Sequence, residues 1–290
     1  IALSGVLLAQ PTSVQLNPNP SRVLGHASSK EILTAAPNFV EGRELTTPQG
    51  IAVDTSGSAQ ILYVADTGNN RVLAWRNPVN AANGAPADLV IGQRDKFRTS
   101  ANGPGTSFTT GLNQPTGLAV DAQGNLYVAD TNNNRVLRYP RPFDQPTDQL
   151  LEIDVMLGQD TFGSSTGGSV GRQPNRGRAT PAANSFFFSD LGSNVLRIRM
   201  AFDGTGNLWI ADSGNNRVVR YPARVLTPGS FGADGDVFLG QLNSISNTQN
   251  QDAREKTTFA LPAGVAFGQD GRMYVSDARG RVLVFRNPSG

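Results

Sequence analysis

An aspartate followed by a nearby arginine recurs along the chain and is its clearest candidate for charge-based chemistry. A carboxylate and a guanidinium at fixed spacing could form an ion pair or part of a binding site. Carboxylates at strand ends also accept hydrogen bonds from turn N–H groups, and a following arginine can pair with them. We therefore expect a structural role. The four copies are Asp66 with Arg71, Asp130 with Arg135, Asp212 with Arg217 and, one residue closer, Asp277 with Arg281.

Other residue types offer little for catalysis. His26 is the only histidine and cysteine is absent, so neither a histidine-rich metal site nor thiol chemistry can be built. No Gly-x-Ser-x-Gly nucleophile elbow occurs. The oxygen-rich turns that begin at Asp121 and Asp203 would suit calcium, but they lack the carboxylate density and terminal glutamate of an EF-hand. We therefore expect no cofactor, with calcium as the one alternative.

The elements that position these residues belong to an internal repeat. Each copy has three short runs of alternating apolar residues, separated by Asp/Asn/Gly turns, and three copies continue into an Asp-x-x-x-Gly-Gln run. This pattern predicts a four-stranded antiparallel meander with two apolar faces. Such a sheet must stack on copies of itself, and radial stacking of four-stranded sheets gives a β-propeller. The copies span residues 48–75, 115–139, 200–221 and 262–285, and the fourth runs span 88–93, 154–159 and 236–241.

Composition agrees with a single all-β domain, expected over residues 21–290. The 290 residues are 38% hydrophobic and only 17% charged, with 32 glycines and 18 prolines, as in chains of short strands and many turns. A net charge of +2, without clustered basic residues, gives no support to nucleic-acid binding.

The N-terminal segment, residues 1–20, is treated separately. Its first ten residues are apolar and resemble the end of a signal peptide, although an edge strand of the domain explains them equally well. They are too few to span a membrane, so no membrane insertion is expected. The signal-peptide interpretation predicts an extracellular or periplasmic protein.

The repeat resembles a known family. The pattern Pro-x-Gly-Ile/Leu-Ala-Val-Asp, then Gly-Asn-Leu-Tyr-Val-Ala-Asp and Asn-Asn-Arg-Val, is similar to the NHL repeat, in its long bacterial form, over residues 45–286. The resemblance implies a β-propeller, commonly six-bladed. It also implies functions from protein or RNA docking and extracellular sensing to, in a minority, lyase chemistry. The chain departs from the pattern at Arg199, which replaces a glycine, and at Gly268, which replaces an aspartate.

Only four blades are evident, and the last has no fourth strand in its own copy. The run Ser21–His26 matches the fourth-strand element, so we expect it to close the last blade. The same strand could instead cap the open blade of another copy by strand addition. Five or six blades would result if residues 6–16 or further sequence contributed strands.

Long loops outside the repeat, at residues 94–114 and 160–195, favour a non-enzymatic scaffold or binding function, because binding residues tend to lie on loops held by a rigid frame. Its partners would be other copies, another protein or a glycan. A metal-assisted lyase or lactonase with oxygen ligands in the channel is the alternative. The aromatic run in the second loop is expected to plug a blade edge rather than to dock a partner. The candidate partner surface comprises Phe186, Phe187, Phe188, Arg172, Arg176 and Arg178.

Overall fold

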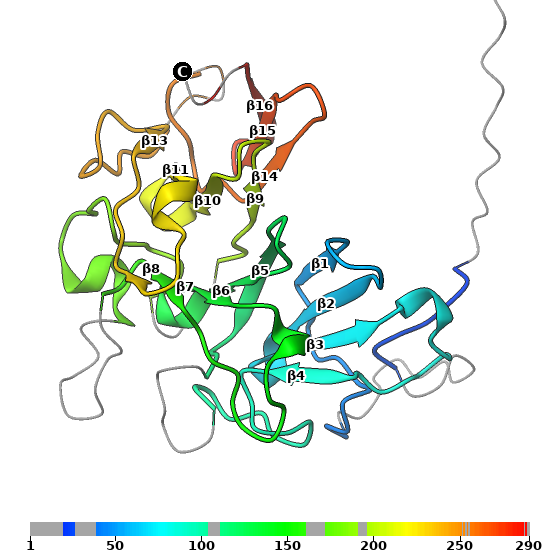
Figure 1. Ribbon diagram of the computed structural model, residues 1–290. Coiled ribbons are helices and arrows are strands. Elements are labelled where there is room, and N and C mark those ends of the chain that lie inside the picture. Colours follow the sequence, from blue (N-terminus) through cyan, green and yellow to red (C-terminus); the bar gives the residue numbers. More distant parts are fainter. Residues whose placement is uncertain are drawn as a thin grey trace, which may run out of the picture.

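The computed structural model describes residues 20–26, 39–103, 111–160, 172–190, 196–250, 252, 254, 256–286 and 288. They form four β-sheets, one for each copy of the repeat, connected by loops and short 3₁₀ turns (Figure 1). No helix among these residues has the length and apolar character needed to cross a bilayer. The described residues thus form a four-bladed, all-β propeller.

Each blade is an antiparallel meander in which consecutive strands are neighbours. Blade 1 contains β1 (Gly50–Asp54), β2 (Ile61–Asp66), β3 (Arg71–Arg76) and β4 (Leu89–Ile91). Blade 2 contains β5 (Pro115–Val120), β6 (Leu126–Asp130), β7 (Arg135–Tyr139) and β8 (Val155–Leu157). Blade 3 contains β9 (Met200–Phe202), β10 (Leu208–Asp212), β11 (Arg217–Tyr221) and β13 (Val237–Leu239). Blade 4 contains β14 (Gly264–Phe267), β15 (Met273–Asp277) and β16 (Arg281–Phe285).

One short strand departs from the repeat. Strand β12 (Ser230–Phe231) lies in the loop that follows β11 of blade 3, yet it pairs in parallel with β8 of blade 2. This addition gives blade 2 a fifth strand at its outer edge. The loop of one blade therefore ties that blade to its predecessor.

Asparagines shape the turns between the second and third strands. Asn70, Asn134 and Asn216 each have a φ of 53°, a left-handed conformation that asparagine tolerates better than most residues. Each ends a 3₁₀ turn, so that the third strand returns directly beside the second. These turns span Thr67–Asn69, Thr131–Asn133 and Ser213–Asn215, and others span Pro78–Asn80, Pro142–Asp144, Pro174–Gly177 and Ala223–Val225.

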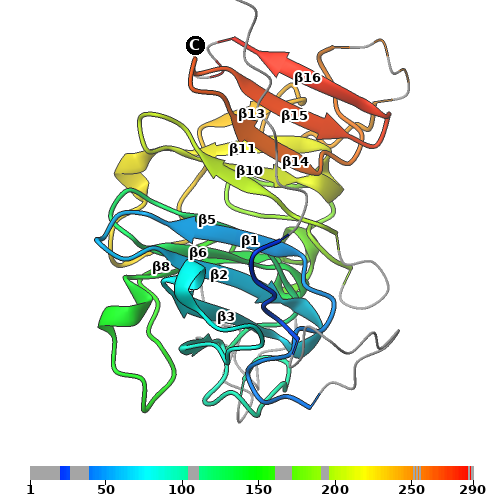
Figure 2. The same ribbon diagram turned by 90° about the vertical axis from the view of Figure 1, so that its right-hand side faces the viewer.

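The blades stack face to face in chain order (Figure 2). At each interface one kind of face meets the other. One face, here called the alanine face, carries the alanine of the first strand; the opposite, aliphatic face carries the larger residues beside it. Ala52 of blade 1, for example, packs in one cluster with Leu118 and Val120 of blade 2. The alanine faces include Ala52, Ala119, Ala201 and Ala266, and the aliphatic faces include Ile51, Leu118, Met200 and Val265.

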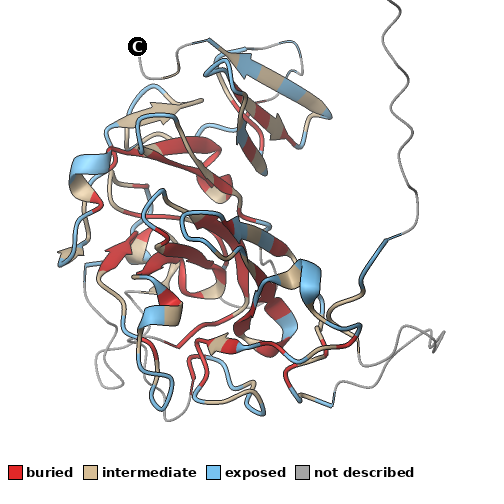
Figure 3. Cartoon of the chain, turned by 45° about the vertical axis from the view of Figure 1, so that its right-hand side comes forward, coloured by how far each residue is buried: buried red, intermediate tan, exposed pale blue. Residues whose placement is uncertain are grey.

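The core lies between the blades (Figure 3), whereas the two outermost faces of the stack carry exposed apolar residues. On the aliphatic face of blade 1, Ile51 is 68% exposed and Val53 is 49% exposed. On the alanine face of blade 4, Val282 is 60% exposed and Val284 is 54% exposed. Each terminal blade therefore keeps apolar sheet surface that inner blades bury.

The expected closure of the last blade by the N-terminal run is wrong. Val23 accepts a hydrogen bond from the Gly84 N–H and donates its own N–H to the Asn83 side chain, both in the loop that leads to β4. Leu24 packs with Trp75 of blade 1. This run thus covers part of the aliphatic face of blade 1, while blade 4 has three strands among the described residues. Residues 1–19, which include the candidate signal remnant, lie outside the described ranges.

Candidate functional site

The repeated aspartate–arginine pairs are ion pairs. In blades 1 to 3 the arginine Nε lies 2.7 Å from the aspartate Oδ2, and all six side chains are buried. The blade 4 pair, Asp277 with Arg281, is 3.0 Å apart and lies nearer to solvent. A buried carboxylate is tolerated when it is both paired and hydrogen-bonded, which is the arrangement in these blades.

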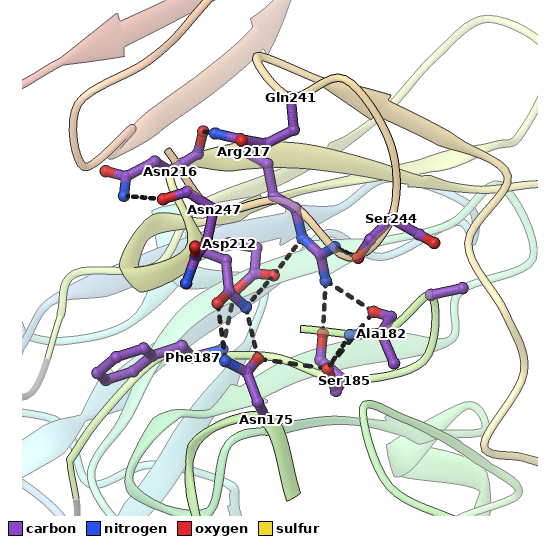
Figure 4. A network of polar contacts seen from close by, with 12 residues as sticks. Asn175, Ala182, Ser185, Phe187, Asp212, Asn216, Arg217, Gln241, Ser244 and Asn247 are labelled. Atoms are coloured by element: carbon purple, nitrogen blue, oxygen red, sulfur yellow. Dashed lines mark hydrogen bonds and ion pairs between the residues drawn. The ribbon is translucent and has the colours of Figure 1, made fainter. Parts of the chain in front are cut away.

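The pair in blade 3 shows what these residues do (Figure 4). Asp212 accepts a hydrogen bond from the Phe187 N–H at 2.8 Å. Arg217 donates to the carbonyl oxygens of Ala182 and Ser185 at 2.9 Å each, and to that of Ser244 at 2.6 Å. The ion pair therefore clamps two loops, one before the blade and one after it, onto the strand ends.

The turn asparagines link one blade to the next. The Asn134 Oδ1 accepts the N–H groups of Phe188 and Ser189, in the segment that leads to blade 3, and its Nδ2 donates to the Arg172 carbonyl oxygen. Asn70 and Asn216 accept from the corresponding segments of blades 2 and 4. The recurring polar residues of the motif are thus occupied in joining loops, strands and blades.

The residues of the candidate partner surface differ in how far they are buried. Phe186 and Phe188 are buried in the core between blades 2 and 3, where their rings stack at 4.5 Å, so they cannot serve as a partner surface. They plug the blade interface because the asparagine link holds their backbone against blade 2. Phe187 and Arg172 are partly buried.

The two remaining arginines of this surface differ in exposure. Arg176 forms an ion pair with Asp160, and Arg178 is exposed. Parts of both long loops, residues 104–110, 161–171 and 191–195, lie outside the described ranges.

Grooves lie between consecutive blades. The groove between blades 1 and 2 has a volume of about 260 Å³ and is lined by Asp54, Tyr63, Arg76, Phe143 and Asp144, among others. The corresponding groove between blades 2 and 3 is lined by Asp121, Tyr127, Arg138 and Asp203, among others.

A buried tyrosine stands at the same point in both grooves. Burial raises the pKa of the Tyr63 phenol, and it raises that of Tyr127 to about 12, so both remain neutral hydroxyls at physiological pH. The sequence alone did not identify the grooves, because a groove depends on which blades are neighbours.

An arginine takes the place of a glycine at the inner end of blade 3. Arg199 donates to the Gln49 carbonyl oxygen of blade 1 at 2.6 Å and to the Ile198 carbonyl oxygen at 2.9 Å. With Arg197 it lines a cavity of about 340 Å³ that faces Thr47 and Gln49. Burial, together with the nearby Arg197 charge, lowers the pKa of Arg199. The substitution thus connects two blades that are not consecutive.

The described residues contain no group of three or more histidine, cysteine, aspartate or glutamate side chains close enough to hold a metal ion. In the turns that suggested calcium, each aspartate accepts hydrogen bonds from N–H groups of its own turn. Asp121 accepts the N–H groups of Gln123 and Asn125, and Asp203 accepts those of Thr205 and Asn207. Their carboxylates therefore serve as turn acceptors, as hairpin chemistry predicts.

Comparison with known proteins gives one family match and several distant similarities. The NHL repeat family matches residues 112–139. Teneurin-3 from Danio rerio is 24% identical over 190 residues, which is 63% of this chain and 7% of the teneurin. The chain thus spans a small part of that relative.

Among solved structures, the nidogen/laminin complex is 15% identical, with 83% of this chain and 61% of that chain covered and a TM-score of 0.43. A streptogramin B lyase is 12% identical over 82% of this chain and 68% of that one, with a TM-score of 0.35. A gluconolactonase from Xanthomonas campestris is 18% identical over 83% and 57%, with a TM-score of 0.35.

The matched segment, residues 112–139, contains β5, β6 and the turn asparagine that links blade 2 to blade 3. The same strands and turns recur in the other blades. Residues 112–139 are thus similar to an NHL repeat, and the four stacked sheets form a β-propeller.

Proposed function

We propose that this propeller is a non-enzymatic scaffold that binds protein through the outer faces of its two terminal blades. The observation that carries the proposal is the apolar surface left exposed on both, at Ile51 and Val53 in blade 1 and at Val282 and Val284 in blade 4. Exposed contiguous apolar surface on a folded protein marks an interaction site. It supports the blade faces, rather than the long loops, as the binding surface.

The loops are less suited to the task because their described parts are bound to the blades. Arg71 donates to the Lys96 carbonyl oxygen, and Gln93 donates to that of Ser100. In the second loop, Phe186 and Phe188 are core residues. Surface that is already committed to the propeller is unavailable to a partner.

The partner that fits best is a second copy of the chain, bound head to tail. The exposed surface of blade 4 belongs to an alanine face, and that of blade 1 belongs to an aliphatic face that the N-terminal run covers in part. These are the two kinds of face that meet at every interface within the molecule. A contact between two different faces is heterologous. Repetition of such a contact gives a closed ring if the rotation between copies closes, and an open filament if it does not.

One feature makes this contact weaker than the interfaces inside the molecule. The blade 4 turn, Asp277 to Arg281, has no counterpart of the linking asparagine at Asn216. The segment before blade 1 would therefore find no side-chain acceptor on blade 4. We expect a reversible, concentration-dependent association that depends on apolar packing.

Sedimentation equilibrium over a range of protein concentrations tests the proposal. Ile51→Asp and Val284→Asp each place a charge on one free face, and each should reduce association at least tenfold by leaving an unpaired charge in the contact. Leu242→Asp is the matched control, because Leu242 is 93% exposed in a loop, and it should associate as the unmodified chain does. A strictly monomeric chain, or association that neither face variant weakens, would refute self-assembly.

A further inference from the structure

The residue opposite the second-strand aromatic differs between blades. On the alanine face, Tyr127 of β6 is paired across the strands with Arg138, and Trp209 of β10 is paired with Arg220. In blade 1 the same register pairs Tyr63 with Ala74. Blade 1 thus lacks the guanidinium that blades 2 and 3 place beside this ring.

In blade 2 that guanidinium is fully used. Arg138 donates to the Tyr127 hydroxyl at 3.4 Å and to the Leu226 carbonyl oxygen of blade 3 at 2.6 Å. It also pairs with both carboxylate oxygens of Asp154, at 2.6 and 2.7 Å. The cation therefore satisfies a buried phenol, an interblade carbonyl and a carboxylate together.

Blade 1 retains the phenol without the cation. The Tyr63 side chain is fully buried, and its hydroxyl has no hydrogen-bond partner among the described residues. Asp88, the counterpart of Asp154, is exposed and accepts the Arg76 N–H instead. A buried hydroxyl without a partner costs free energy comparable to a lost hydrogen bond, so the groove has an unused binding group.

The two arginines of this groove already have partners. Arg76 lies over the Phe143 ring, 4.5 Å from its centroid, and Arg141 pairs with Asp144. Asp54 is buried beside the groove, where one of its oxygens accepts the Ser56 N–H at 2.8 Å. Its second carboxylate oxygen has no hydrogen bond among the described contacts, so it can receive a ligand.

We propose that the groove between blades 1 and 2 binds a guanidinium or ammonium group. The incoming cation takes the role that Arg138 has in the next groove, donating to the Tyr63 hydroxyl and pairing with Asp54. Its source is either a small amine or guanidine, or an arginine or lysine side chain of a peptide; both present the same chemistry. This site is separate from the terminal faces and does not depend on self-assembly.

Isothermal titration of the unmodified chain with methylguanidine, and with an acetylated, amidated Ala-Arg-Ala peptide, tests the proposal. We expect one saturable site per chain for at least one of the two ligands. Methylguanidine binding alone assigns the site to small molecules, and peptide binding alone assigns it to a side chain. Methylurea, which has the same shape without the charge, should bind at least tenfold more weakly because it cannot pair with Asp54.

Two variants locate the site. Tyr63→Phe removes one hydrogen bond and should weaken binding roughly tenfold. Its matched control, Tyr127→Phe, removes the hydroxyl in the groove that Arg138 already fills, and should leave binding unchanged. Ala74→Arg supplies the missing cation from the chain itself and should abolish binding; if this variant does not fold, the two tyrosine variants decide the matter.

Absence of saturable binding to either ligand overturns the proposal. If methylurea binds as tightly as methylguanidine, the site does not require a charged ligand and the proposal is wrong on this point. If Tyr63→Phe and Tyr127→Phe weaken binding equally, the assignment to this groove is wrong. Arg138 already fills the second groove, so loss of the Tyr127 hydroxyl should have no effect on binding.

Discussion

The buried ion pair of blade 2 allows a sharp test of whether the recurring motif is structural. Arg135→Met keeps an unbranched apolar stem but removes the guanidinium and its charge. The hydrogen bonds that are lost and those that Asp130 keeps set the magnitude. The 2.7 Å bond to Asp130 disappears, the 3.1 Å bond to the Gly111 carbonyl oxygen disappears, and Asp130 keeps the hydrogen bonds from Asn113 and Asn133.

Removing one partner of a buried pair costs about 3–5 kcal/mol, because the other charge stays buried without compensation. Because Asp130 retains two hydrogen bonds, we expect the free energy of unfolding to fall by about 3 kcal/mol, at the lower end of this range. For a domain of this size the melting temperature should fall by roughly 6–12 °C. Adding Asp130→Asn to Arg135→Met removes the unpaired charge, so the double variant should recover part of the stability.

Urea unfolding followed by the fluorescence of the two tryptophans measures the change. Arg141→Met is the control, since its ion pair with Asp144 lies in solvent and its loss should not move the midpoint. The reasoning is refuted if Arg135→Met unfolds at the midpoint of the unmodified chain. A variant that kept its stability and lost ligand binding would show that the motif is a binding site.

Two further predictions concern acid stability and the contact between inner strands. Burial alone would raise the pKa of Asp203, but hydrogen bonds from Trp209, Asn207 and Thr205 lower it below its ordinary value of 3.8. A carboxylate with a lowered pKa stabilises the folded state above its unfolded pKa and loses this effect as the pH falls through its folded pKa. The stability difference between the unmodified chain and Asp203→Asn in urea unfolding should therefore shrink from roughly pH 5 to pH 3, and a constant difference would contradict this assignment. At Gly50 an added Cβ would lie 2.0 Å from the Thr116 carbonyl oxygen of the neighbouring blade, whereas at Gly204 it would meet nothing within 4 Å. Gly50→Ala should cost about 1–3 kcal/mol in the same assay and Gly204→Ala almost nothing; equal midpoints would show that blades 1 and 2 can separate without cost.

The sequence was sufficient to predict what is local and repeated. Strand alternation, Asp/Asn/Gly turns and the repeat itself predict four blades and the order of their strands, as the structure shows. The alternation also predicts two apolar faces per blade. Each of these features depends on neighbouring residues or on a pattern present several times.

Features that depend on one particular long-range contact were not predicted. The run Ser21–His26 resembles a fourth strand, but its sequence does not specify which sheet it contacts, and it packs on blade 1. The strand β12 has two residues, too few for a periodic signal. The groove at Tyr63 did have a signal: Ala74 stands where the aligned copies have Arg138 and Arg220, and only the cross-strand register shows its importance.

The constant pairing of an alanine face with an aliphatic face also has an evolutionary consequence. Because every internal interface joins the same two kinds of surface, duplication of one repeat inserts a blade that presents the correct face to both neighbours. Deletion of a repeat likewise brings an alanine face onto an aliphatic face. Blade number can therefore change by whole units through recombination within the gene, without new interfaces having to evolve at the same time.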